Sequence, residues 1–194
     1  QTMTTHYPDL TLQPDPQFPQ PQLMSALMAK LHRALVQRGS GDIGISFPHY
    51  VQTCKPTLGA TLRLHGTDAA LRELMAQDWL RGMRELVEPA QNGAPLPVPP
   101  GARALCVQRR QFDTSIDRLR RRRMLRKGET PEQAEAALPQ PTAQRQALPH
   151  VHLRSTSTGQ SYCLHIDQTP VPVACDSGQF NTYGLSHGRT VPLV

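Results

Sequence analysis

The chain has 194 residues, of which 38% are hydrophobic and 19% charged, and its formal net charge is +6. This length suffices for one large domain or two small ones with a buried core, without disulfides or a structural metal. No stretch approaches the roughly 20 apolar residues that a membrane helix needs, and no basic-then-apolar secretory signal opens the chain. We therefore predict a cytoplasmic protein that does not contact a membrane.

The N-terminal residues predict a strand followed by a helix. Apolar and polar residues alternate over 10–12, and a turn is expected at 14–16, where an aspartate stands between two prolines. A leucine then recurs at every fourth position from Leu23 to Leu35, as on one face of a helix that ends at Gly39.

Two further strands and a second helix follow. Apolar residues alternate over 43–47 and over 62–64, and Thr67 is in the position of an N-cap for the helix behind it. A fourth strand is expected near 83–87 or just after the proline-rich stretch. This order, strand, helix, strand, strand, helix, strand, is ferredoxin-like. We predict an α+β protein with an N-terminal ferredoxin-like domain over residues 1–92.

The second half of the chain is less regular. Prolines over 89–100 predict a linker or a long extended connection, so a second domain is expected over residues 101–194. A strand at 105–107 precedes a basic segment, and a proline-interrupted region follows. Alternating residues on both sides of the polar loop 155–160 predict a hairpin. We expect an irregular α+β domain that carries an arginine-rich helix.

The basic segment runs from Arg118 to Lys127 and holds seven positive charges with no acidic residue between them. Subtracting these seven charges from +6 leaves the rest of the chain at −1, so the basicity is local. Arginine favours a helix, although a solvated helix face or tail without a partner is the alternative. Charges that repel one another predict a polyanionic partner, and an arginine-rich helix suits a distorted or terminal RNA duplex. We therefore expect the irregular α+β domain over residues 101–194 to be an RNA-binding domain.

A metal site is not expected. The four cysteines are scattered and form no CxxC pair, so neither a disulfide framework nor a zinc site is indicated. His150 and His152 lie two apart on an expected strand and could share a face as ligands. No third ligand at a useful spacing accompanies them, and we predict no metal and no cofactor.

Four segments carry a resemblance over essentially the whole chain. They are residues 10–32, 43–48 (Ile-Gly-Ile-Ser-Phe-Pro), 153–160 (Leu-Arg-Ser-Thr-Ser-Thr-Gly-Gln) and 183–186 (Tyr-Gly-Leu-Ser). In this order, with the basic segment between the second and third, they resemble the CRISPR-associated endoribonuclease of type I-F systems, which processes repeat RNA. The resemblance implies the CRISPR repeat RNA stem-loop and other subunits of the type I-F surveillance complex as partners, and a chain that is monomeric apart from that complex.

The resemblance also implies a mechanism. RNA carries its own nucleophile, the 2′-hydroxyl, so cleavage to a 2′,3′-cyclic phosphate needs no metal. His32 would be the general base or proton-transfer residue, a role that suits histidine because its pKa in water is ~6.5. Ser155 would anchor the 2′-hydroxyl, Tyr183 would orient the histidine, and His187 is a second candidate for proton transfer. Without the resemblance, His32 is interpreted as a surface histidine, Ser155 as a turn hydroxyl and Tyr183 as a packed aromatic.

Further residues are implied to bind the RNA. Arg109 and Gln111 would read bases in the major groove near the foot of the stem, where the duplex ends. Ser157 and Thr158 would touch the backbone near the cut. Tyr162 would stack on the closing base pair, although its parity with the apolar positions of its strand also allows a core position.

The stem is expected to be gripped by arginines of the basic segment. Leu125 stands where the family has arginine, and Arg118 or Arg123 would substitute for the missing one. The implied stem contacts are Arg118, Arg121, Arg122, Arg123 and Arg126. We expect the enzyme to stay bound to its product. Two other functions remain open at this point: a relative that holds the hairpin without cutting it, and a basic protein that binds DNA or is purely structural.

Overall fold

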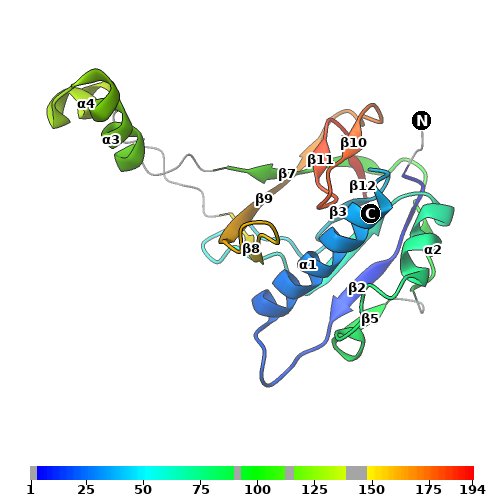
Figure 1. Ribbon diagram of the computed structural model, residues 1–194. Helices are drawn as coiled ribbons and strands as arrows, with labels where there is room; N and C mark the ends of the chain where they lie inside the picture. Colours follow the sequence, from blue (N-terminus) through cyan, green and yellow to red (C-terminus); the bar gives the residue numbers. More distant parts are fainter. Residues whose placement is uncertain (1–3, 90–92, 112–115, 139–147) are drawn as a thin grey trace. The chain divides into compact units, whose positions relative to one another are not determined.

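The computed structural model describes four stretches of the chain, 4–89, 93–111, 116–138 and 148–194. They belong to two compact units (Figure 1). The larger unit comprises residues 1–110 and 147–194, and the smaller unit comprises residues 111–146. Helices and antiparallel sheets are both present, so the predicted α+β class is confirmed. Among the described residues, no helix has both the length and the apolar character to span a membrane.

The first sheet of the larger unit is antiparallel and has the strand order β3-β4-β2-β5. Its strands are β2 (Asp9–Leu12), β3 (Gly44–Ser46), β4 (Thr61–His65) and β5 (Val87–Pro89). With α1 and α2 between them, these elements follow one another in the expected succession of strands and helices.

Both helices of this unit begin and end where local chemistry favours it. The helix α1 (Gln20–Arg38) buries the leucines that recur at every fourth position from Leu23 to Leu35. It ends at Gly39, whose φ of 66° only glycine adopts easily. The Gly39 N–H donates to the carbonyl of Leu35 at 2.9 Å. The helix α2 (Asp68–Ala76) is capped by Thr67, whose hydroxyl accepts a hydrogen bond from the N–H of Ala70.

The second sheet is also antiparallel and has the order β12-β7-β9-β8. Its strands are β7 (Arg103–Arg110), β8 (His150–Arg154), β9 (Ser161–Val171) and β12 (Val191–Leu193). The predicted hairpin is present as β8 and β9. The C-terminal strand β12 was not predicted, because three residues that include Pro192 give no alternation to detect.

Short strands complete the larger unit. The pair β1 (His6–Tyr7) and β6 (Leu96–Pro97) places part of the expected linker 89–100 against the N-terminal segment. The pair β10 (Gln179–Phe180) and β11 (Ser186–His187) flanks a tight turn, and η1 (Arg84–Leu86) is a single 3₁₀ turn before β5.

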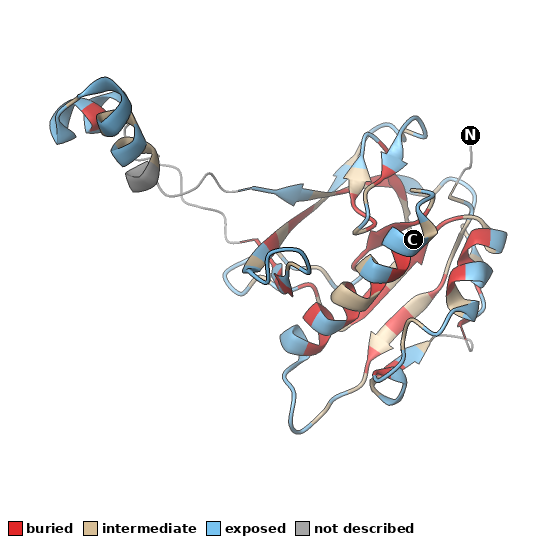
Figure 2. Ribbon diagram, in the orientation of Figure 1, coloured by how far each residue is buried: buried red, intermediate tan, exposed pale blue. Residues whose placement is uncertain are grey.

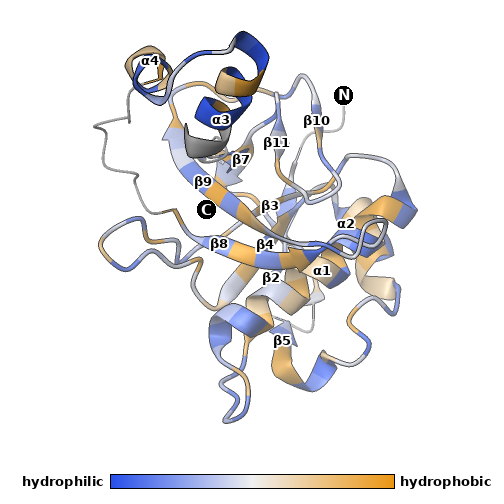
Figure 3. Cartoon of the chain, turned by 60° about the vertical axis from the view of Figure 1, so that its left-hand side comes forward, coloured by the Kyte–Doolittle hydropathy of each residue, from blue (hydrophilic) through white to orange (hydrophobic). Residues whose placement is uncertain are grey.

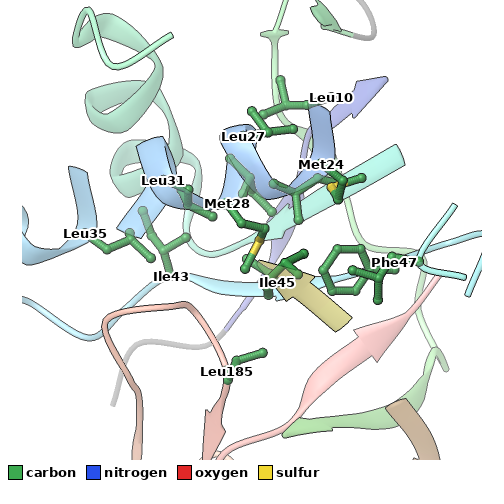
Figure 4. Close-up of a cluster of buried hydrophobic side chains, with 14 of the residues drawn as sticks. Leu10, Met24, Leu27, Met28, Leu31, Leu35, Ile43, Ile45, Phe47 and Leu185 are labelled. Carbon is green, nitrogen blue, oxygen red and sulfur yellow. The ribbon is translucent and has the colours of Figure 1, made fainter. Parts of the chain in front are cut away.

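Both sheets contribute to one hydrophobic core, which explains why the compact units differ from the predicted domains 1–92 and 101–194. Side chains of α1 and β3 pack together with Leu185 (Figure 4), and the same cluster includes apolar residues of β7, β8 and β9. The side-chain amide of Gln168 in β9 bonds both the N–H and the carbonyl of Phe47 at 2.8 Å. Tyr50 donates its hydroxyl to the carbonyl of Ile166. Residues from both halves of the chain therefore share one core, and the compact units divide after residues 110 and 146 instead of between residues 92 and 101.

The smaller unit is a pair of helices, α3 (Ile116–Lys127) and α4 (Pro131–Ala137). The predicted basic helix is thus present as α3. The helix α4 was missed inside the proline-interrupted region, although Thr130 and Gln133 form a capping box and Pro131 occupies the first turn. Figure 2 shows this unit as largely exposed, with Ala134 buried.

Candidate active site

His32 lies half-buried on α1, beside the buried Leu31. Its Nδ1 is 2.8 Å from the carbonyl oxygen of Thr182. A carbonyl oxygen can only accept, so Nδ1 is the protonated nitrogen and Nε2 of the neutral ring is left with a free lone pair. The tautomer that the backbone selects is therefore one in which Nε2 can take a proton.

The turn that supplies this carbonyl is held by side-chain and backbone hydrogen bonds. The side-chain oxygen of Asn181 accepts from the N–H groups of Tyr183 at 2.9 Å and Leu185 at 3.0 Å. Gly184 adopts a φ of 75°, and a Cβ there would lie 2.7 Å from the Cγ2 atom of Ile45. The Ile45 N–H donates to the carbonyl of Gly184 at 2.9 Å, which ties the turn to β3. Only glycine permits this close approach.

The ring of Tyr183 stacks on His32, with ring centroids 4.0 Å apart and an interplanar angle of 6°. Its hydroxyl is hydrogen-bonded to the hydroxyl of Tyr162 in β9. Burial, reinforced by this hydrogen bond, raises the pKa of Tyr183 to about 12, while the positive charge of Arg109 acts in the opposite direction. Tyr183 is therefore a neutral phenol at physiological pH, suited to orienting the histidine rather than accepting its proton.

Ser155 begins the loop between β8 and β9, directly after the strand position of Arg154. Its backbone closes the loop, since its N–H donates to Gln160 and its carbonyl accepts from Gly159. Its hydroxyl lies 3.1 Å from that of Ser157 and accepts from the N–H of Thr158 at 3.2 Å. The three hydroxyl residues of the predicted site are therefore gathered in one ordered, largely exposed loop.

The structure brings some of the predicted residues into direct contact. His32, Tyr183 and Tyr162 form one chain of contacts. Tyr162 pairs with Leu153 across the hairpin, and Leu153 lies two positions before Ser155. The loop that contains Ser155 therefore directly joins the strand that carries Tyr162. His187 lies exposed on β11 and borders a pocket at the C-terminal end of α1 together with Thr182.

Tyr162 takes the core-facing position that the parity of its strand allows. It is half-buried against the core, and its hydroxyl reaches Tyr183. Neither Thr182 nor Asn181 was predicted: Thr182 acts through its backbone carbonyl, which leaves no signal in a sequence, whereas Asn181 acts through its side chain. The stretch Asn181 to Gly184 does contain the asparagine and glycine that mark turns, and this signal could have located it.

Arg109 is the last residue but one of β7, Gln111 directly follows the strand, and both are exposed. Arg109 pairs in the ladder with Ile166, whereas its neighbour Arg110 binds the carboxylate of Asp167 at 2.7 Å. Arg110 is thus paired within the protein, although both arginines are exposed at this end of the strand.

The arginines of α3 divide into two groups. Arg120 donates to the carbonyl of Leu138 at 2.9 Å, and Arg123 holds Glu129 with two hydrogen bonds of 2.6 and 3.1 Å. These two join α3 to its own flanking segment. The remaining described cations are exposed, and Figure 3 shows hydrophilic colouring over much of the helix. They are Arg121, Arg122, Arg126 and Lys127.

Leu125 lies among these exposed arginines and is itself 89% exposed. It is four residues from Arg121 and three from Arg122, so all three share one helix face. The side chain of Arg118 lies outside the described residues, and Arg123 is engaged by Glu129.

Comparison with known proteins gives a consistent result. A family model described as CRISPR-associated protein (Cas_Csy4) matches residues 7–194. The chain is 43% identical over 187 residues to the CRISPR-associated endonuclease Cas6/Csy4 of Pseudomonas aeruginosa (strain UCBPP-PA14), covering 96% of this chain and 98% of the relative. It is 40% identical over 190 residues to the protein of the same name from Escherichia coli (strain UTI89 / UPEC), with the same two shares, 96% and 98%.

Proposed function

Because the chain belongs to the Cas_Csy4 family of CRISPR-associated proteins, we propose that it is an endoribonuclease that cleaves CRISPR repeat RNA at the 3′ base of its hairpin. The observation that carries the proposal is the hydrogen bond from His32 Nδ1 to Thr182, combined with the stack on Tyr183. These contacts leave a histidine fixed in orientation and able to accept a proton at Nε2.

The reaction uses the nucleophile that RNA provides. His32 Nε2 takes the proton of the 2′-hydroxyl, and the oxygen attacks the adjacent phosphorus. The bond to the 5′-oxygen breaks, and this oxygen takes up a proton from the His32 imidazolium or from water, which gives a 2′,3′-cyclic phosphate and a 5′-hydroxyl end. Alignment and the removal of one proton supply the rate enhancement, so the step needs no metal ion.

Ser155 is the group that anchors the reacting ribose. Its hydroxyl is hydrogen-bonded to that of Ser157 and accepts from the N–H of Thr158, so it is already oriented in the absence of RNA. Ser157 and Thr158 contact the backbone next to the cut. A hydroxyl in a closed turn loses little conformational freedom on binding, which favours its use as an anchor.

The exposed arginines of α3 bind the phosphates of the stem. Arg121, Arg122 and Arg126 are exposed and charged, whereas Arg123 contributes chiefly by fixing Glu129. Arg109 and Gln111 read bases at the foot of the stem. Because these contacts do not involve the scissile bond, they persist after cleavage and retain the product, which makes the protein a subunit of the guide-RNA complex.

The direct test is cleavage of a repeat RNA in excess EDTA by the unmodified protein and by His32→Ala. We expect full activity in EDTA and a loss of roughly 10²–10⁴ in cleavage rate for the variant, the range typical of a lost general base. Affinity for the hairpin should be unchanged. His49→Ala, at an exposed histidine, is the matched control and should cleave normally.

Two further arms complete the test. His187→Ala should retain activity, and RNA with a 2′-deoxyribose at the cut should bind but stay intact. A requirement for magnesium, or full activity of His32→Ala, would overturn the mechanism. Tight binding of the hairpin with no cleavage of unmodified RNA would identify a binding module, and equal affinity for duplex DNA would rule out RNA as the specific ligand.

A further inference from the structure

The outer face of the β8–β9 hairpin carries a cluster of metal-ligating side chains. Val151, Leu153, Leu164 and Ile166 are buried in the core, so the alternate positions of both strands face away from it. In the ladder, His152 stands opposite Cys163 and His150 stands opposite His165. Three histidines and a cysteine therefore occupy neighbouring positions on one face of two paired strands.

The distances within this cluster are close to those of a metal site. His150 Nε2 and His152 Nε2 are 3.2 Å apart, and the Sγ atom of Cys163 is 3.3 Å from His152 Nδ1. One ligand atom from each of these three residues can be chosen so that all lie within 4.8 Å of one another. A tetrahedral zinc ion, with bonds of about 2.0–2.1 Å to nitrogen and about 2.3 Å to sulfur, places its ligand atoms about 3.3–3.7 Å apart. The two short distances involve different ring nitrogens of His152, so binding requires the exposed side chains to turn until one nitrogen of His152 faces the ion together with His150 and Cys163.

We propose that His150, His152 and Cys163 bind a divalent transition-metal ion of the zinc class. Imidazole and thiolate are the donors that such an ion prefers. The fourth position is left to water or to His165, whose ring centroid is 5.1 Å from that of His150. Binding converts the Cys163 thiol to a thiolate and releases its proton to the buffer.

Spacing along the sequence does not reveal this set, because Cys163 is remote from the two histidines along the chain. Only the hairpin register brings it opposite His152. The cysteine also lacks the CxxC partner by which zinc sites are usually recognised.

The ion would connect β8 to β9 at the base of the loop that contains Ser155. One of its ligands already has a fixed backbone, because the His152 N–H donates to the hydroxyl of Ser25 on α1 at 3.0 Å. None of the three ligands belongs to the proposed catalytic group. The site is therefore structural, and its occupation stabilises the hairpin without entering the cleavage reaction.

The experiment is a titration of the metal-free full-length protein with Zn²⁺ and with Co²⁺, by calorimetry and by absorption. We expect one ion per chain, release of a proton, a near-ultraviolet thiolate-to-cobalt band, and a higher melting temperature with Zn²⁺. Cys163→Ser should abolish the thiolate band and weaken binding at least about tenfold. Cys54→Ser, at an exposed cysteine elsewhere, is the matched control and should bind normally.

Two results would overturn the proposal. One is the absence of stoichiometric binding by the unmodified protein, and the other is unchanged binding by Cys163→Ser and by His150→Ala/His152→Ala. Because all three residues are at the surface, melting curves without metal should coincide for variants and unmodified protein. Cleavage of repeat RNA by the variants, measured in parallel in EDTA, separates a failure of this site from a failure of the proposed activity.

Discussion

The two compact units of this protein use charged and polar side chains in different ways. In the larger unit, His32 is positioned by a helix, a glycine-containing turn and a second sheet, all anchored in a buried core. In the smaller unit, Arg121, Arg122 and Arg126 are exposed on a helix that buries little. Proton transfer requires a fixed position, whereas binding phosphate requires chiefly a concentration of charge.

The smaller unit also shows that its arginines are not equivalent. Arg120 and Arg123 bind groups of the adjoining segment, and α4 is stabilised by its capping box. Interactions of this kind each stabilise an exposed helix only modestly. A helical pair with so small a core thus uses two arginines of the basic segment for its own contacts, and one of them, Arg123, is among the stem contacts implied by the resemblance.

The largest effect is expected from removing the exposed cations together. Arg121→Ala/Arg122→Ala/Arg126→Ala should weaken hairpin binding on the order of a hundredfold at moderate salt, since three cations that neutralise phosphate are removed. The slope of log K against log salt should fall by about 2 to 3. Cleavage at saturating RNA should be retained. Filter binding over a salt series measures both quantities, and an unchanged slope would show that this helix face does not contact phosphate.

A smaller effect is expected from loosening the histidine. Tyr183→Leu removes the stack on His32, and we expect kcat to fall about tenfold with little change in affinity. Tyr183→Phe keeps the stack and loses only the hydrogen bond to Tyr162, so it should recover most of the rate. Single-turnover cleavage measures the rate of the cleavage step separately from the affinity for RNA. Equal losses in both variants would assign the role to the hydroxyl instead of the ring.

The core of the larger unit should respond to acid through His65. Burial lowers the pKa of His65 to about 3, and its Nε2 is hydrogen-bonded to Ser46 at 2.7 Å. The folded state binds this proton more weakly than the unfolded chain does. The corresponding stability is therefore fully present above pH 6.5 and is lost as the pH falls toward 3, with a slope of up to about 1.4 kcal/mol per pH unit.

Denaturant unfolding between pH 7 and pH 4 tests this dependence. His65→Leu should flatten the acid side of the profile, while His49→Leu, at an exposed position, should leave it unchanged. A profile that is equally steep in His65→Leu would assign the acid sensitivity to other groups. Because His65 belongs to the core, the transition should follow the larger unit.

The smallest effect is expected from Leu125→Arg. The side chain is 89% exposed and lies between arginines, so the change adds a charge without disturbing packing. Affinity for the hairpin should rise a few-fold and the salt slope should increase by about 0.7–0.9. Leu125→Gln is the uncharged control. Unchanged affinity in Leu125→Arg would show that the stem does not reach this position.

Periodicity and capping were sufficient to predict most of the elements. Three of the predicted features are present: the regularly spaced leucines of α1, the cap at Thr67 before α2, and the alternation in β8 and β9. They are local patterns, and local patterns are what a sequence displays. The helix α4 was missed although its cap was visible, and β12 was missed because its pairing with β7 is decided far along the chain.

The sequence by itself determined the family, the α+β class and the residues whose chemistry fits RNA cleavage. Only the tertiary structure decided which of them meet. It selected the tautomer of His32 through a backbone carbonyl, engaged Arg123 with Glu129, and set Cys163 opposite His152. The sequence specifies the type of each side chain, but the partners of that side chain depend on strand register and on packing between segments remote in sequence.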